Sequence, residues 1–334
     1  MGYTLSVIGC GTMGIAVLSG VVASLDSSQS QSQSQIASAL PTIVKRAIPK
    51  WESHTPGTTT PVASPDASVP SRFIATVRRA ESANRLRGVF DALGSLGETV
   101  EVVSGQNLMA IEQSDVVLLC CKPQLAHTIL AEPGVRDALA GKLLISILAG
   151  VTIAQLSALV PEDTRVVRAM PNTPCKIREG MTVVSTPPPS SVPSPHPPSP
   201  TAELDRLIIL TIFSSIGRCR FLEEKHFDAC TALSGSGPAF ACIFLEAMAD
   251  GGVMMGLPRA EALELAAQTM QGAARMALQP NAHPAQIKDS VTTPGGCTIA
   301  GLLAMEDGRV RSTIARAIQV ATDRASELGQ PANK

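Results

Sequence analysis

The chain has 334 residues, of which 45% are hydrophobic, and this is enough apolar material to build two hydrophobic cores. Its formal net charge is -1 and its aromatic content is 3%. The chain therefore has no overall positive field that would attract nucleic acid or an anionic membrane, and its few aromatic side chains argue against stacking on bases.

The eight cysteines and five histidines show no spacing typical of a metal site. No cysteine pair has the C-x-x-C spacing of zinc or redox sites, and most cysteines lie within apolar runs, where a thiol packs as a small hydrophobic group. The histidines are scattered and are expected to be structural or solvated. The sequence therefore predicts no metal and reduced thiols, which are typical of a cytoplasmic protein.

The first predicted element is an apolar strand at residues 5–8, and a glycine-rich turn joins it to a helix at 13–25. The turn consists of Gly9, Cys10, Gly11, Thr12, Met13 and Gly14. Glycines at this spacing allow a tight turn and close backbone approach to a pyrophosphate, which the N–H groups of Met13 and Gly14 and the helix dipole would hold. The uncharged stretch between Tyr3 and Ser24 is long enough to span a membrane, but no Lys or Arg precedes it. A dinucleotide-binding loop explains the same stretch better.

Two low-complexity segments are interpreted as insertions. Residues 26–71 contain a Ser-Gln repeat followed by many Thr and Pro residues, and residues 186–200 are a Pro/Ser run. Neither composition can bury enough apolar surface to offset the entropy of ordering, so we expect surface loops. Residues 36–48 could extend a helix.

Without these insertions, strands and helices alternate along the first part of the chain. The predicted strands lie at 5–8, 72–77, 100–103, 116–121, 143–148, 165–170 and 182–185. The predicted helices lie at 13–25, 80–93, 107–113, 123–131, 153–159 and 202–216. Continuous apolar strands such as 116–121 are typical of a parallel sheet covered on both faces, so residues 1–223 are predicted to form a Rossmann-type α/β domain.

The end of the second strand should select the cofactor, because an acidic residue there binds the ribose hydroxyls of NADH. Asp26 lies at the usual distance from the glycine turn, but the insertion displaces the second strand, and we interpret Asp26 as lying outside the site. Strand 72–77 ends instead at Arg78 and Arg79, whose guanidinium groups suit a 2′-phosphate. NADPH is the expected cofactor. NADH remains possible because Glu81 is close in sequence, and a solvated basic pair without a ligand is the alternative.

Two later strand ends should lie at the same edge of the sheet. Cys121, Lys122 and Pro123 close the fourth strand, and Ala149 and Gly150 follow the fifth. Cofactors bind outside the carboxyl ends of such strands, so these residues are expected near the nicotinamide. Lys122 could approach the cofactor or only cap its strand.

After residue 221 the strand pattern ends, and residues 224–330 are predicted to form an all-α domain. Helices are expected behind Gly237-Pro238, at 259–278, at 298–305 and at 310–328. These helices are rich in Ala and Met and have little charge on several faces. Each must therefore bury more than one apolar face, which favours packing against a second subunit. This domain is therefore predicted to dimerise.

A second glycine-rich loop precedes one of these helices and is predicted to bind a small anion. Its residues are Thr293, Pro294, Gly295, Gly296, Cys297 and Thr298. Glycine N–H groups before a helix N-terminus form an anion nest, and Thr298 is expected to cap the helix. A plain capped turn is the alternative. Together, the two loops favour a dehydrogenase or reductase acting on a small carboxylate.

Segments that carry a family resemblance occur at 7–14, 114–123, 168–174, 178–180, 233–239, 249–259 and 288–299, and the last two are highly specific. Together they cover almost the whole chain outside the insertions. In these segments the chain resembles the pyrroline-5-carboxylate reductase family, which catalyses the last step of proline synthesis.

The resemblance implies roles for residues at matching positions. The loop from Gly9 to Gly14 would hold the cofactor pyrophosphate. The resemblance further places Asn107, Cys121, Lys122, Ile147, Ala149 and Ser290 at the cofactor, and Glu224, Cys297 and Thr298 at the substrate. It also implies a dimer of interleaved helical domains, and dimers could assemble further.

Some features depart from the family pattern. The two insertions are extra, residue 297 is Cys where Ala would be typical, and the Arg78-Arg79 pair is not shared by all members. Cofactor choice therefore cannot be inherited from the resemblance.

Two other functions remain open. A β-hydroxyacid-dehydrogenase-like oxidoreductase shares this layout but needs a Lys early in the helical domain, and no suitable Lys lies between Lys225 and Lys288. A non-catalytic NADPH-binding regulator would bind the cofactor without turnover.

Overall fold

The computed structural model describes residues 2–34, 65–186 and 200–328, which belong to two compact units. The larger unit contains the described residues of Met1–Thr231 and Ala325–Lys334, and the smaller unit is Ala232–Arg324. The boundary proposed from the sequence, at residue 224, falls near the end of the larger unit.

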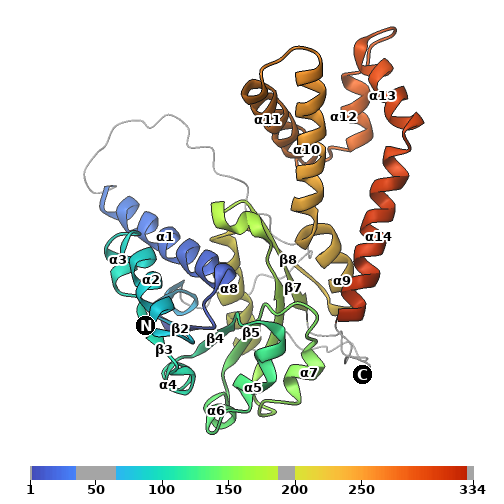
Figure 1. Cartoon of the computed structure of the whole chain (residues 1–334). Coiled ribbons are helices and arrows are strands. Elements are labelled where there is room, and N and C mark those ends of the chain that lie inside the picture. Colours follow the sequence, from blue (N-terminus) through green and yellow to red (C-terminus); the bar gives the residue numbers. More distant parts are fainter. Residues whose placement is uncertain (1, 35–64, 187–199, 329–334) are drawn as a thin grey trace. The chain divides into compact units, whose positions relative to one another are not determined.

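The larger unit is built on an eight-stranded sheet (Figure 1) with the strand order β3-β2-β1-β4-β5-β6-β7-β8. Neighbouring strands run parallel except β6 and β7, which are antiparallel. The strands are β1 Tyr3–Ile8, β2 Pro70–Val77, β3 Glu101–Ser104, β4 Val116–Leu119, β5 Leu143–Ser146, β6 Arg165–Met170, β7 Gly180–Thr186 and β8 Gly217–Glu223. This arrangement confirms the doubly wound α/β class predicted from the apolar strands.

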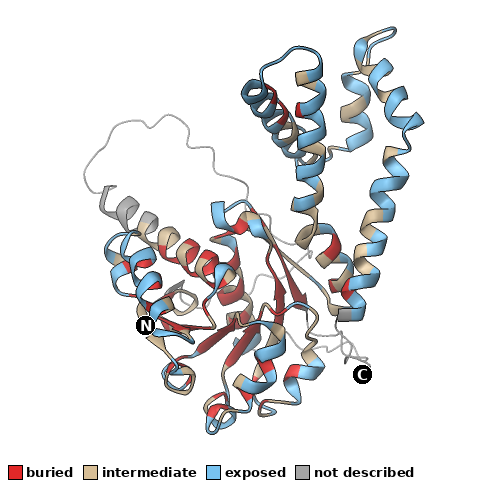
Figure 2. Ribbon diagram, in the orientation of Figure 1, coloured by how far each residue is buried: buried red, intermediate tan, exposed pale blue. Residues whose placement is uncertain are grey.

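Helices cover both faces of this sheet, and each face has its own core (Figure 2). One core packs the sheet against α1 (Thr12–Ser34), α2 (Ala80–Asp91) and α8 (Pro200–Ser214). The other packs it against four short helices, which are α4 (Asn107–Glu112), α5 (Ala126–Leu130), α6 (Val135–Ala138) and α7 (Ile153–Ser157). A small helix, α3 (Ser95–Glu98), follows α2. The central strands are therefore buried on both sides, as their continuous apolar sequences require.

The strand order reverses between β1 and β4, which are adjacent and parallel. Ile8 pairs with Leu119 at the carboxyl ends of these two strands, so Gly9 and Cys120 leave the sheet side by side. In doubly wound sheets, ligands bind outside the carboxyl ends of the strands at such a switch point. The sheet thus places the first glycine turn where a nucleotide would bind.

The smaller unit is entirely helical. Its helices are α10 (Gly237–Met254), α11 (Arg259–Ala277), α12 (Pro284–Ser290), α13 (Cys297–Asp307) and most of α14 (Val310–Leu328). α10 and α11 pack closely, since a Cβ added at Gly252 would lie 3.3 Å from the Cβ of Ala262. Only small side chains such as Ala249, Ala262 and Ala266 are buried, while many large apolar ones are exposed.

Some boundaries differ from those expected from the sequence. Strand β8 was not predicted, because Arg218, Arg220 and Glu223 interrupt its apolar pattern, and α12 was too short for its period to be recognised. α1 continues to Ser34 and β2 begins at Pro70, so both ends of the first proposed insertion have regular structure. The helix considered at 36–48 lies outside the described residues.

One stretch in the described residues, Glu224–Met254, is long and apolar enough to cross a membrane by length and composition alone. This stretch differs from the uncharged N-terminal segment, for which the sequence favours a dinucleotide-binding loop. In the structure this stretch is divided among η4 (Glu224–His226), α9 (Phe227–Cys230), a π-helical turn and α10. Charged side chains at Glu224, Lys225 and Asp228 occupy its first part, and a protein partner for α10 would account for the apolar remainder.

Candidate active site

The first glycine turn connects β1 to α1 at the switch point of the sheet. Gly9 has a φ of +75°, and a Cβ at this position would lie 2.9 Å from the Cα and Cβ of Cys121. A Cβ at Gly14 would lie 3.1 Å from Cγ1 of Val7. These two glycines are therefore required by backbone conformation and by close packing of the turn against neighbouring strands.

Gly11 differs from the other two glycines, because it is exposed and a Cβ there would meet only the Gly9 carbonyl oxygen, at 3.9 Å. Packing against the described residues does not require a glycine at this position. The absent side chain leaves room for a group outside the protein to approach the backbone. This is the arrangement that a dinucleotide pyrophosphate needs.

The first turn of α1 provides donors for such a group. The first helical hydrogen bond runs from the N–H of Ile15 to the carbonyl of Gly11 at 2.8 Å. The N–H groups of Thr12, Met13 and Gly14 precede that bond and are oriented along the helix axis towards its N-terminus. Together with the positive end of the helix dipole, they form an anion-binding position.

A partly buried chain of hydrogen bonds holds this turn in place. The N–H of Gly9 donates to Oγ1 of Thr76 at 3.2 Å, and that hydroxyl donates to Oδ1 of Asn107 at 2.9 Å. Nδ2 of Asn107 in turn donates to Oε1 of Glu132 at 3.3 Å. Asn107, placed at the cofactor by resemblance, thus connects to the glycine turn through Thr76, a residue that sequence reasoning missed. Its only signal in the sequence was a threonine next to the last residue of an otherwise apolar strand end.

Arg78 and Arg79 follow β2 directly and are exposed. Arg79 has extended backbone at the N-cap of α2, with Glu81 in the first turn of that helix. Neither guanidinium pairs with an acidic side chain in the part of the chain that the structure describes. The pair therefore has unused donors beside the switch point, which fits the 2′-phosphate role expected from the sequence.

Cys121, Lys122 and Pro123 lie beyond the end of β4, which stops at Leu119 and not at residue 121. Lys122 is exposed at the N-cap of a 3₁₀ turn that begins at Pro123. Burial raises the pKa of the Cys10 thiol to about 12 and that of Cys121 to about 11. These thiols therefore remain protonated and pack as apolar groups under the turn.

Ile147 and Ala149 continue from β5 at the same edge of the sheet. Ile147 is half-buried and its N–H donates to the carbonyl of Leu119 at 3.1 Å, while Ala149 is exposed. Gly150 follows with a φ of +76° and leads into α7. The larger unit thus brings the glycine turn and the ends of β4 and β5 to one edge, as expected.

Glu224 also belongs to the larger unit, where its carboxylate already has two partners. Oε1 accepts from the N–H of Ile153 at 2.9 Å and from Nη1 of Arg168 at 3.2 Å. The buried Arg168 guanidinium lies 4.8 Å from the ring centroid of Phe227, and its Nε has no partner among the described residues. Arg168 was not expected from the sequence as part of a site.

The Arg168–Glu224 pair borders a cavity of about 400 Å³. Its other lining residues include Gly150, Thr152, Lys225 and Asp228. Glu224 therefore faces a charged cavity beside the carboxyl end of β5, while it ties the start of α7 to β6.

Ser290 and residues 293–298 belong to the smaller unit. The hydroxyl of Ser290 donates to the carbonyl of Ile287 at 2.7 Å, at the end of α12. Gly295 has a φ of +66°, and a Cβ there would meet nothing within 4 Å. Gly296, in contrast, packs under the hydroxyl of Thr293, which lies 2.4 Å from the position of an added Cβ.

Thr298 was expected to cap α13, and the structure shows that this expectation is wrong. Gly296 is the N-cap and makes no side-chain cap, so α13 begins at Cys297 and Thr298 is its second residue. The hydroxyl of Thr298 therefore does not satisfy a backbone donor of the loop. It is left for another partner, next to the exposed Cys297 and the first-turn N–H groups of the helix.

These features define the class of the protein. A reversing parallel sheet, with a glycine turn and an anion-binding helix N-terminus at the switch point, is the nucleotide-binding half of an NAD(P)H-dependent oxidoreductase. Residues 63–150 match the family described as NADP oxidoreductase coenzyme F420-dependent. Residues 224–328 match the family described as pyrroline-5-carboxylate reductase dimerisation.

Full-length relatives identify the family. Pyrroline-5-carboxylate reductase of Lophium arboricola is 45% identical over 98% of this chain and 93% of its own length. The Schizosaccharomyces pombe reductase is 42% identical over 97% of this chain and 98% of its own length. The chain belongs to the pyrroline-5-carboxylate reductase family.

Solved structures have the same fold. A pyrroline-5-carboxylate reductase from Coxiella burnetii aligns with a TM-score of 0.72 and 25% identity, over 98% of both chains. The Plasmodium falciparum pyrroline carboxylate reductase with NADP bound aligns with a TM-score of 0.67 and 24% identity, over 98% of both chains. The Rossmann-type fold with a helical C-terminal dimerisation region is thereby confirmed.

Proposed function

We propose that this chain is an NADPH-dependent pyrroline-5-carboxylate reductase that reduces 1-pyrroline-5-carboxylate to L-proline, the last step of proline synthesis. The observation that carries the proposal is its similarity, over nearly its full length, to reductases of that name at 42–45% identity. NADPH follows from the open guanidinium pair Arg78-Arg79 and from the NADP bound to the Plasmodium relative. NADH is a possible substitute.

When bound, the cofactor supplies a hydride from C4 of its nicotinamide to the C=N carbon of the substrate, and one proton at the ring nitrogen completes the product. The chain has to bind and orient the two molecules. Because a cyclic imine is already a fair base, no side chain with a strongly altered pKa is required.

In the larger unit, the cofactor residues would act mainly by position. The N–H groups of the turn from Gly9 to Gly14 hold the pyrophosphate, and Thr76 and Asn107 keep the turn in place. The residues that follow the adjoining strands β4 and β5 would border the nicotinamide. They are Cys121, Lys122, Pro123, Ile147 and Ala149. A binding site that is already rigid holds the cofactor in one orientation, so less entropy is lost when cofactor and substrate reach the reactive geometry.

In the smaller unit, the loop amides of Thr293, Gly295, Gly296 and Cys297 would hold the substrate carboxylate. The hydroxyl of Thr298, which caps nothing, would hydrogen-bond the ring nitrogen and orient the C=N bond. Ser290 would reach the cofactor. Glu224, which faces its own charged cavity, would offset the positive charge of the protonated imine.

The family match to a dimerisation region implies an oligomer, and we propose a homodimer that could assemble further. We also propose a cytoplasmic location, because most of the cysteines lie in apolar runs, where a thiol packs as a small hydrophobic group.

Following NADPH absorbance tests the proposed reaction. The purified chain should oxidise NADPH only when 1-pyrroline-5-carboxylate is added and should form one L-proline per NADPH consumed. NADPH binding without turnover would indicate a regulator, and turnover with β-hydroxyacids alone would indicate the related dehydrogenase. The same assay with NADH tests Arg78-Arg79, since a clear NADH preference contradicts their assigned role.

A further inference from the structure

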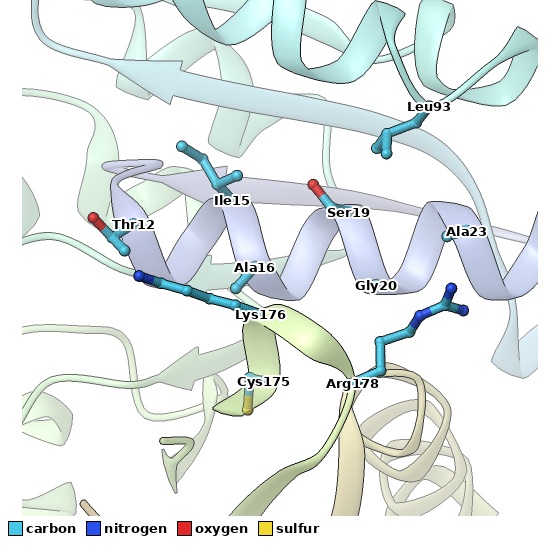
Figure 3. A pocket seen from close by; sticks show the side chains of 10 residues that line it. All are labelled: Thr12, Ile15, Ala16, Ser19, Gly20, Ala23, Leu93, Cys175, Lys176 and Arg178. Atoms are coloured by element: carbon cyan, nitrogen blue, oxygen red, sulfur yellow. The ribbon is translucent and has the colours of Figure 1, made fainter. Parts of the chain in front are cut away.

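A separate cavity of about 380 Å³ lies along the side of α1 (Figure 3). Its apolar floor is made of Ile15, Ala16, Gly20 and Ala23, and Leu93 closes one side. The opposite side is η3 (Thr173–Ile177) and the residue that follows it. The volume lies within the range of small-molecule sites.

Two cationic side chains border this cavity, and none of the described residues that line it carries a carboxylate. Lys176 extends along α1 towards Thr12, whereas Arg178 extends in the other direction, towards Ala23 (Figure 3). Thr12 and Ala23 are eleven residues apart, about 16 Å along the helix axis. The cavity thus has a positive charge near each end and an apolar middle.

These two charges have no partners within the described protein. No hydrogen bond or ion pair joins Lys176 or Arg178 to another described side chain. Arg178 also has a φ of 59°, a left-handed conformation that glycine usually provides at the end of a helical turn. An arginine in this conformation costs about 1 kcal/mol relative to the ordinary right-handed one.

The wall formed by α1 contains an unsatisfied polar atom. Oγ of Ser19 is buried and has no hydrogen-bond partner among the described residues. Ser19 is one of the residues that line the cavity, and its hydroxyl points to the side of α1 away from Lys176 and Arg178 (Figure 3). A buried hydroxyl without a partner is unfavourable, so this helix has a polar group that the described residues do not satisfy.

We propose that this cavity binds an elongated dianion, with an acidic group at each end and an apolar chain between them. One carboxylate contacts Lys176, the other contacts Arg178, and the methylene chain lies on Ala16 and Gly20. A simple anion would leave one cation unpaired, and a neutral amphiphile would leave both. The site is independent of the residues proposed for cofactor and substrate, apart from Thr12 at its edge.

Calorimetry with three eight-carbon probes tests the proposal. Suberate carries two carboxylates, octanoate one, and 1,8-octanediol none. We expect suberate to bind the intact chain about tenfold more tightly than octanoate, because one charge-assisted contact is worth about that factor. The diol should bind more weakly than both.

Single variants assign the two ends. In Lys176→Ala and in Arg178→Ala, suberate affinity should fall to the level of octanoate, while Arg85→Ala, an exposed control on α2, should leave it unchanged. A circular dichroism spectrum and an NADPH affinity equal to the parent's confirm that each variant is folded. Equal binding of suberate and octanoate by the parent, or full suberate affinity in both cavity variants, would overturn the proposal.

Discussion

The two glycines Gly9 and Gly11 lie two residues apart, yet they have different physical reasons to be glycine. Gly9 has a left-handed backbone and touches Cys121, whereas Gly11 is exposed to open space. The first requirement is internal to the fold, whereas we propose that the second comes from the bound cofactor. Substitution can therefore separate folding from binding.

We expect Gly9→Ala to lower the free energy of unfolding by about 1–3 kcal/mol, because it combines backbone strain with a contact under 3 Å. Gly11→Ala should unfold like the parent but bind NADPH at least about tenfold more weakly, because its methyl group occupies the pyrophosphate position. Urea unfolding and NADPH titration measure the two effects. A Gly11→Ala chain with parental NADPH affinity would remove this loop from the cofactor site.

Thr298 is the second residue of α13, and its hydroxyl has no capping role. We therefore expect Thr298→Ala to fold normally and to lose about one to two orders of magnitude in kcat/KM, as for other single positioned donors. Thr313→Ala is the matched control, since that hydroxyl donates only to the Arg309 carbonyl within its own unit. Unchanged steady-state kinetics in Thr298→Ala would exclude this hydroxyl from the reaction.

At the scale of elements, the sequence predicts those parts whose pattern is local. The apolar strand before a glycine turn and the helices behind Pro238 and Pro258 were found because neighbouring residues carry the whole signal. Strand β8 and the link from Thr76 to Asn107 were not, because both depend on partners far away in sequence. The Arg168–Glu224 pair joins residues 56 positions apart and has no local signature.

A buried thiol on strand β8 makes the free energy of unfolding depend on pH. Burial raises the pKa of Cys219 from 9.0 to about 12, only partly offset by nearby Arg206. The folded chain therefore retains a proton that the unfolded chain loses, so this residue contributes stability below pH 9 that is lost as the pH rises towards 12. Its largest contribution to the slope is about 1.4 kcal/mol per pH unit.

Cys219→Val removes this titration while keeping an apolar side chain of similar size. Between pH 9 and 11, we expect its free energy of unfolding to fall less steeply than that of the parent, as measured by urea unfolding with a reductant present. Equal slopes would mean that the Cys219 thiolate is tolerated in the folded strand.

At the scale of the whole molecule, the smaller unit does not bury its own apolar side chains. Met254 and Met255 are 88% and 84% exposed at the end of α10, and Ile243 is 65% exposed on the same helix. Monomers rarely expose so many large apolar groups in one region. Residues 224–328 match a dimerisation family, so packing against another subunit accounts for these exposed apolar side chains and no membrane is needed.

We expect the double variant Met254→Glu with Met255→Glu to weaken self-association by at least about tenfold, because it places two charges in an apolar contact. Light scattering over a dilution series measures the change. Glu264→Lys, at an exposed and already charged position of α11, should associate like the parent. Parental association of the methionine variant would place the interface on another face of the helices.

We propose that this chain transfers a hydride from NADPH to the C=N carbon of 1-pyrroline-5-carboxylate. The reaction can be run with NADPH deuterated at nicotinamide C4, once for each face of the ring, and the product analysed by mass spectrometry. One of the two labelled cofactors should yield L-proline that is one mass unit heavier, with the deuterium at C5. Proline without label from either cofactor, or labelled cofactor left unconsumed, would contradict the claim.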